Sequence, residues 1–184
     1  MTEEIIIAGF GGQGVLSMGK ILAYSGIMQE QEVSWLPSYG PEMRGGTANV
    51  TVILSDDRVS SPVLQSYDTA ILLNQQSMDK FESAVKPGGL MIYDPNGITR
   101  HPERDDIRIF QVEATAEAAR MKSPITFNML VLGAYIKVNP VVNLENVIKG
   151  LRKSLPQRHH HLIPKNEAAI TRGMEMVHEA KLTS

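Results

Sequence analysis

One junction near the amino terminus constrains the fold of this chain more than any other stretch. Residues 5–8 are apolar without alternation, which is typical of a strand buried in a parallel sheet. Gly9, Gly11 and Gly14 follow with the spacing G-x-G-x-x-G, and a helical pattern begins at Val15. In a strand–loop–helix unit, this spacing lets the loop backbone approach a phosphate or pyrophosphate. The junction therefore predicts the first unit of an α/β fold.

The rest of the chain continues the alternation of strand and helix patterns. Small residues on the first helix, Gly19 and Gly26, predict that it lies close to a sheet. Strands are expected at 32–36, 49–54, 69–73, 90–93 and 107–112, with an antiparallel return at 59–63, and helices through 78–85 and at 114–121 and 125–138. Asn143 and Pro164 can each open a later helix. The pattern predicts a single α/β domain over residues 1–184: a doubly wound, Rossmann-like, mostly parallel sheet with helices on both faces and a helical C-terminal portion.

Composition narrows the classes of function. The formal net charge is −2, so no basic field attracts nucleic acid or anionic lipid. The chain has no cysteine, which excludes disulfides, thiolate nucleophiles and cysteine-held iron–sulfur clusters in it. The acidic start, Met1–Glu4, lacks the positive region of a signal peptide, and the most apolar later stretch is too short to span a bilayer. We expect a cytoplasmic protein that binds neither nucleic acid nor membrane.

The glycine loop has two interpretations. Gly11, Gly12, Gln13 and Gly14 could offer backbone N–H groups to an anion at the helix N-terminus. Alternatively, the glycines could only permit a tight strand-to-helix turn. A nicotinamide site needs an acidic residue about 20 residues beyond the loop, at the end of the second strand. That strand runs into Pro37 and Ser38, without Asp or Glu, so a nucleotide-binding module or NAD-dependent dehydrogenase is only the alternative.

A second loop, residues 37–46, reads Pro-Ser-Tyr-Gly-Pro-Glu-Met-Arg-Gly-Gly. It leaves the strand ends at which a doubly wound sheet forms its binding crevice, so a binding role is expected. Glu42 and Arg44 in this loop can form ion pairs. The residues predicted to bind a cofactor or a partner are Gly9, Gly11, Gly12, Gln13 and Gly14 in the first loop and Ser38, Tyr39, Glu42, Arg44, Gly45 and Gly46 in the second.

Together the two loops resemble the gamma subunit of 2-oxoacid:ferredoxin oxidoreductases. Further positions occur in the family's order: Ser61-Pro62, Leu73-Asn74-Gln75, Lys86-Pro87-Gly88-Gly89 and the helix with Asn128. The resemblance implies a complex that splits a 2-oxoacid with coenzyme A, releasing carbon dioxide and acyl-coenzyme A and reducing ferredoxin. The substrate would be 2-oxoglutarate, or else pyruvate or 2-oxoisovalerate.

The resemblance also implies what the partners supply. No Gly-Asp-Gly with a distant Asn is present to hold magnesium and thiamine diphosphate; Asp94-Pro95-Asn96-Gly97 has the wrong layout. Thiamine diphosphate, magnesium and iron–sulfur clusters would sit on alpha, beta and delta-type subunits. This chain would hold no cofactor alone and no catalytic residue. Its glycine loop would contact coenzyme A, thiamine diphosphate or a partner backbone, and an isolated chain could form a homodimer.

Two other features are expected to have structural rather than catalytic or metal-binding roles. Arg158 and the adjacent His159, His160 and His161 are expected in a solvated or partner-contacting segment, because adjacent imidazoles point in different directions. Met174 and Met176 in the last helix are expected in the core or an interface.

Overall fold

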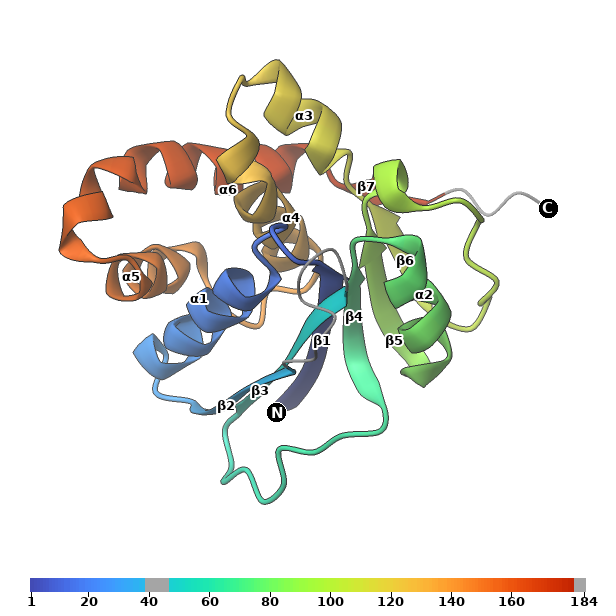
Figure 1. Ribbon diagram of the computed structural model, residues 1–184. Helices are drawn as coiled ribbons and strands as arrows, with labels where there is room; N and C mark the ends of the chain where they lie inside the picture. Colours follow the sequence, from blue (N-terminus) through green and yellow to red (C-terminus); the bar gives the residue numbers. More distant parts are fainter. Residues whose placement is uncertain (39–46, 181–184) are drawn as a thin grey trace.

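The computed structural model describes residues 1–38 and 47–180, and in these ranges seven strands form one sheet in the order β2-β3-β1-β4-β5-β6-β7 (Figure 1). The strands are β1 (Thr2–Phe10), β2 (Glu32–Ser38), β3 (Thr47–Ser55), β4 (Tyr67–Leu72), β5 (Val85–Tyr93), β6 (Arg108–Gln111) and β7 (His178–Glu179). β1, β4, β5 and β6 are mutually parallel, whereas β3 pairs antiparallel with both β1 and β2. At the other edge, β7 pairs antiparallel with β6.

Helices cover both faces of this sheet unequally, as Figure 1 shows. They are α1 (Val15–Met28), α2 (Gln75–Phe81), α3 (Ala114–Arg120), α4 (Phe127–Val138), α5 (Leu144–Ser154) and α6 (Ile163–Met176), with short 3-10 turns η1 (Glu82–Ala84), η2 (Pro95–Gly97), η3 (Pro124–Thr126) and η4 (Gln157–Leu162). The large core lies between the sheet and α1, α3, α4, α5 and α6. A smaller core lies between the other face and α2. The predicted α/β class, with helices on both faces and a helical C-terminal portion, is confirmed.

Alternation along the strands explains the two cores. Ile5 and Ile7 point into the larger core, and Ile6 and Ala8 into the smaller one. Each of these four side chains is at most 1% exposed. This continuous burial on both faces is why the sequence shows an unbroken apolar run rather than alternation.

The small residues of α1 set how closely it lies on the sheet. A Cβ on Gly19 would come within 2.6 Å of Val50 Cγ1, and one on Gly26 within 2.7 Å of Leu54 Cδ2. Both neighbours belong to β3. The predicted close approach of the first helix to the sheet is therefore confirmed, and glycine is required for it.

Two local predictions were wrong. No strand forms at 59–63: this segment makes no ladder and is largely exposed, with Val63 73% exposed. The helix expected through Val85 ends at Phe81, and Val85 begins β5 after a 3-10 turn. Lys86-Pro87-Gly88-Gly89 therefore belongs to β5, near a shift in the β4–β5 register between Tyr67 and Thr69.

Candidate functional site

The glycine loop lies at the carboxyl edge of the parallel strands, between β1 and α1. Gly12 and Gly14 adopt φ values of +92° and +73°, in the left-handed region that favours glycine. Gly14 is the N-cap of α1, and the first helical hydrogen bond joins the Met18 N–H to the Gly14 carbonyl at 2.9 Å. No side chain of the described residues caps this helix. The helix start therefore presents N–H groups and the positive end of the helix dipole.

Three glycines of this loop, Gly9, Gly12 and Gly14, have different surroundings. A Cβ on Gly9 would lie 2.5 Å from Gln13 Oε1, and one on Gly14 would overlap the side-chain amide of Asn128. Gly12 differs, because no described atom lies within 4 Å of the position where its Cβ would be. Gly9 and Gly14 are thus needed for packing, and Gly12 faces open space.

That open space continues into a cavity of about 420 Å³. Gly12 and Gln13 form one side of it, and the opposite walls come from α3, η3 and the start of α4. The lining is largely apolar, and its polar residues besides Gln13 are Asn96 of η2 and Thr115 at the start of α3. The lining residues are Gly12, Gln13, Asn96, Thr115, Ala118, Ala119, Pro124 and Phe127.

Asp94, at the end of β5, fixes one wall of this cavity. It is 1% exposed, and its carboxylate accepts hydrogen bonds from the Asn96 N–H (3.0 Å), the Thr115 N–H (2.9 Å) and the Thr115 hydroxyl (2.6 Å). The carboxylate thus ties η2 to the first turn of α3. The carboxylate oxygens are therefore used in structural hydrogen bonds, and these bonds hold Asn96 and Thr115 in position at the cavity.

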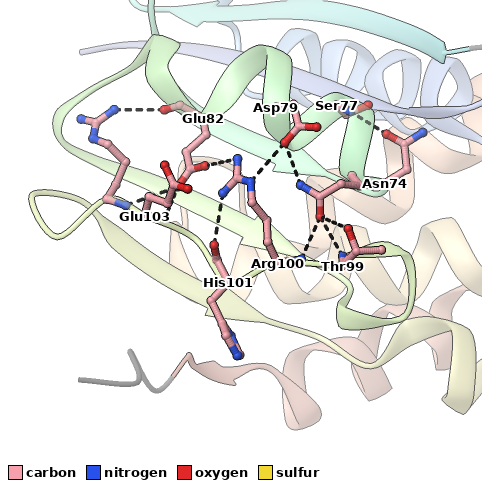
Figure 2. A network of polar contacts seen from close by, with 10 residues as sticks. Asn74, Ser77, Asp79, Glu82, Thr99, Arg100, His101 and Glu103 are labelled. Carbon is pink, nitrogen blue, oxygen red and sulfur yellow. Dashed lines mark hydrogen bonds and ion pairs between the residues drawn. The ribbon is translucent and has the colours of Figure 1, made fainter.

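A polar network holds the segment after η2 against α2 (Figure 2). Gln75 Oε1 accepts hydrogen bonds from the Thr99 N–H at 2.7 Å and the Arg100 N–H at 3.1 Å. Arg100 forms ion pairs with Asp79 at 3.1 Å and with Glu82 at 2.7 Å. The Glu82 side chain is only 7% exposed and also accepts from the Glu103 N–H at 2.6 Å. These hydrogen bonds and ion pairs therefore hold the connection between β5 and β6 in place at several points.

The glycine loop, residues 9–14, contains no titratable side chain, and the clearly displaced pKa values of Glu3 and Glu117 belong to other elements. Burial raises the pKa of Glu3, at the opposite, amino edge of the sheet, where it accepts from Thr69 (2.5 Å) and Asn139 (2.8 Å). The guanidinium groups of Arg120 and Arg172 lower the pKa of Glu117 from 4.5 to about 2. What the described part of the loop offers a ligand is backbone dipoles and shape rather than a proton donor or acceptor with a tuned pKa.

The described residues that flank the second predicted loop, Ser38 and Thr47, lie at the same edge of the sheet as the glycine loop. β2 runs in the same direction as β1 because both are antiparallel to β3, so Ser38 ends at the same edge as Phe10. Thr47, which follows the second loop, pairs directly with Phe10. Ser38 is exposed there. The predicted residues Tyr39, Glu42, Arg44, Gly45 and Gly46 lie outside the described residues.

Gln13 plays a different part from the one expected. Its N–H donates to the Phe10 carbonyl at 3.2 Å and is therefore engaged within the loop. The cavity walls at Asn96, Thr115 and Phe127 were not foreseen. They lie more than 80 residues from the loop in sequence, and no local motif links them to it.

The histidine segment forms η4. His160 Nε2 lies 2.9 Å from the Leu155 carbonyl oxygen, and the rings of His159 and His161 are 6.4 Å apart. Within residues 1–38 and 47–180, no group of three or more His, Cys, Asp or Glu side chains is arranged to hold a metal ion. In the same ranges, no helix combines the length and the apolar character needed to cross a bilayer.

A sheet with parallel central strands, a glycine loop at a helix N-terminus and an adjoining cavity define a Rossmann-like binding domain. Residues 4–176 match the family described as pyruvate ferredoxin/flavodoxin oxidoreductase, and the chain belongs to this family. The resemblance inferred from the two loops is confirmed.

Individual relatives agree with the family assignment. The 2-oxoglutarate synthase subunit KorC of Methanocaldococcus jannaschii is 32% identical over 183 residues, covering 97% of this chain and 96% of the relative. The ketoisovalerate oxidoreductase subunit VorA of Methanothermobacter marburgensis is 39% identical over 130 residues, which is 71% of this chain but only 27% of VorA. The solved gamma subunit of a keto/oxoacid ferredoxin oxidoreductase from Geobacter sulfurreducens has a TM-score of 0.83 and 27% identity, with 96% of each chain covered. The chain is thus of the gamma-subunit type.

Proposed function

We propose that this chain completes the catalytic site of a 2-oxoacid:ferredoxin oxidoreductase in the cytoplasm, beside alpha, beta and delta-type subunits that hold thiamine diphosphate, magnesium and iron–sulfur clusters. The reaction is the coenzyme A-dependent oxidative decarboxylation of a 2-oxoacid, with ferredoxin as electron acceptor. The observation that carries the proposal is the open face of Gly12 beside a cavity of about 420 Å³ in a gamma-type chain.

The role of the glycine loop follows from its electrostatics. The N-terminus of α1 carries partial positive charge and unpaired N–H groups, which suit the diphosphate of coenzyme A. Because Gly12 has no Cβ, a phosphate or a partner backbone can approach the main chain closely. Arg44 and Glu42 of the second loop complete the site, as a cation for the anion and as a polar contact to a partner.

The substrate proposed is 2-oxoglutarate. The 2-oxoglutarate synthase subunit KorC aligns with this chain over nearly the full length of both proteins. VorA, by contrast, is matched over only 27% of its length. Similarity to a 2-oxoglutarate synthase subunit over nearly its full length is the observation that supports this choice.

The sheet order disfavours the alternative, an NAD-dependent dehydrogenase. In a dinucleotide site, the acidic residue that binds the ribose ends the strand beside β1. Here β3 takes that place, runs antiparallel, and presents Thr47 and Ala48 beside Phe10 and Gly9. Neither side chain can serve as the carboxylate that accepts from both ribose hydroxyls. Isothermal titration of the isolated chain should accordingly detect no micromolar binding of NAD.

The test compares two matched variants of the assembled enzyme, Gly12→Leu and Gly88→Leu. Both glycines have positive φ (+92° and +78°), and at neither position does a described atom lie within 4 Å of the point that a Cβ would occupy. Each substitution therefore costs about 1–2 kcal/mol of backbone strain. Only Gly12 lies at the proposed site, because Gly88 lies at the amino-edge cavity with Glu3 and Asp68.

The enzyme is assayed with 2-oxoglutarate, pyruvate and 2-oxoisovalerate, coenzyme A and a viologen acceptor, after co-purification with its partner subunits. Gly12→Leu should raise the apparent KM for coenzyme A or prevent assembly, whereas Gly88→Leu should do neither. Normal assembly and an unchanged KM for coenzyme A in Gly12→Leu would refute a role of the glycine loop in the site.

A further inference from the structure

The side chain of Gln13 connects the ends of two neighbouring strands. Its Oε1 accepts a hydrogen bond from the Phe10 N–H at 2.6 Å, at the end of β1. Its Nε2 donates to the Leu73 carbonyl at 3.3 Å, directly after β4. These parallel strands are adjacent in the sheet, but α1 and α2, which follow them, cover opposite faces. Gln13 thus connects the two strand ends from which the chain continues to opposite faces of the sheet.

Asn128, in the first turn of α4, holds the other end of the loop. Its Nδ2 donates to the Gly14 carbonyl at 3.3 Å, the same carbonyl that accepts the first helical hydrogen bond of α1. Its amide also fills the space that a Cβ on Gly14 would need. The preceding residue, Phe127, lines the cavity beside Gly12. Asn128 therefore connects the loop to the wall opposite it.

The two amides account for the pattern of glycines. Gln13 Oε1 occupies the space beside Gly9, and Asn128 occupies the space beside Gly14. With both ends held, the turn at Gly11 and Gly12 faces outward, and both of these residues are exposed next to the exposed Phe10. A loop held in one conformation loses less entropy when a ligand or a partner binds it.

We propose that Gln13 and Asn128 are positioning residues that hold the Gly11–Gly12 turn in its binding conformation through their side-chain amides. The hydrogen bonds that fix the conformation of the loop are formed within this chain. Only the identity of what binds the turn rests on the proposed function, so the two are tested by separate measurements.

Amide hydrogen exchange on the full chain tests whether the Gln13 side chain stabilises the conformation of the loop. Gln13→Met keeps the length of the side chain but removes both hydrogen bonds, and Gln65→Met changes an exposed glutamine near the amino end of β4 as the control. A hydrogen bond worth about 1 kcal/mol corresponds to roughly fivefold faster exchange of the Phe10 amide in Gln13→Met. The amides of Met91 and Ile92 in β5 report global unfolding. If the Phe10 amide exchanges no faster, or accelerates only as much as those of β5, the proposal is overturned.

Asn128→Asp and Asn128→Ala in the assembled enzyme test what the loop binds. Asp adds a negative charge beside the Gly14 carbonyl, where an anionic ligand would bind, and Ala only removes the hydrogen bond. The apparent KM for coenzyme A should rise at least about fivefold in Asn128→Asp, and less in Asn128→Ala, with kcat nearly unchanged. Faster exchange in the loop with an unchanged KM supports the positioning role and refutes coenzyme A as the ligand. Unchanged exchange and an unchanged KM overturn both.

Discussion

Glu117 should contribute to stability in a pH-dependent way that can be worked out from its contacts. The carboxylate lies on α3, and its side chain is 7% exposed. It accepts from Arg120 Nε at 2.9 Å and from Arg172 Nε of α6 at 2.8 Å. These guanidinium groups lower its pKa from 4.5 to about 2. The ion pairs thereby join α3, which forms a wall of the cavity, to the C-terminal helix.

The magnitude follows from linkage. A shift from 4.5 to about 2 would correspond to ~3.4 kcal/mol at 1.36 kcal/mol for each unit. Arg120 and Arg172 are 67% and 40% exposed, so solvent screening reduces this figure. We expect about 1–2 kcal/mol. Because the pKa is lower in the folded state, the contribution is fully present above the unfolded value of 4.5 and is lost as the pH falls toward 2.

Urea unfolding of the wild type and of Glu117→Gln tests this reasoning. At pH 7 the variant should be less stable by about 1–2 kcal/mol, and at pH 3 most of that difference should be lost. Glu145→Gln is the control, because Glu145 forms an exposed pair with Lys149 (2.9 Å) and is itself 77% exposed, so its effect should be unmeasurable. A difference between the wild type and Glu117→Gln that is the same at both pH values would refute the assignment of the effect to ionised Glu117.

Three further outcomes are expected. Gly133→Ala places a Cβ against the Ile170 carbonyl of α6, and the overpacking should cost about 3 kcal/mol and lower Tm by roughly 6–10 °C. The control, Lys137→Ala on an exposed part of α4, should leave Tm unchanged. Asn143→Ala removes the cap that accepts from the Asn146 N–H at 2.8 Å, and should lower the free energy of unfolding in urea by about 1 kcal/mol. Under the proposed function, dilution of the purified complex should release this chain, which sedimentation would detect as a loss of mass in parallel with a loss of activity.

Much of the fold could be predicted because local patterns carried it. The apolar run of β1, the small residues facing β3 from α1 and the cap at Asn143 each depend on neighbours in sequence, and each prediction was confirmed. The errors at 59–63 and at Val85 have another origin. Residues 59–63 read Val-Ser-Ser-Pro-Val, so a proline interrupts the segment, and an antiparallel return from β3 finds both edges of β3 occupied by β1 and β2.

The site was less predictable, because its parts meet only in three dimensions. Glycine spacing located the loop but could not separate the packing role of Gly9 and Gly14 from the open position of Gly12. That distinction depends on Asn128, which is 114 residues from Gly14. The cavity walls on α3 and α4 reach the loop only through tertiary packing, for which the sequence holds no periodic signal.

The position of β3 links the fold to the function. A glycine loop of this spacing serves nicotinamide binding only when the neighbouring strand is parallel to β1 and ends in an acidic residue. The hairpin of β2 and β3 puts an antiparallel strand there instead, and brings Ser38, at the end of β2, and Thr47, at the start of β3, to the same edge as the glycine loop. One change of strand order thus removes the position from which an acidic residue would bind the ribose. This geometry explains why the glycine motif alone predicts a nicotinamide site, whereas the glycine motif and the 37–46 motif together predict a site of another kind. In the sequence, 23 residues separate Gly14 from Pro37.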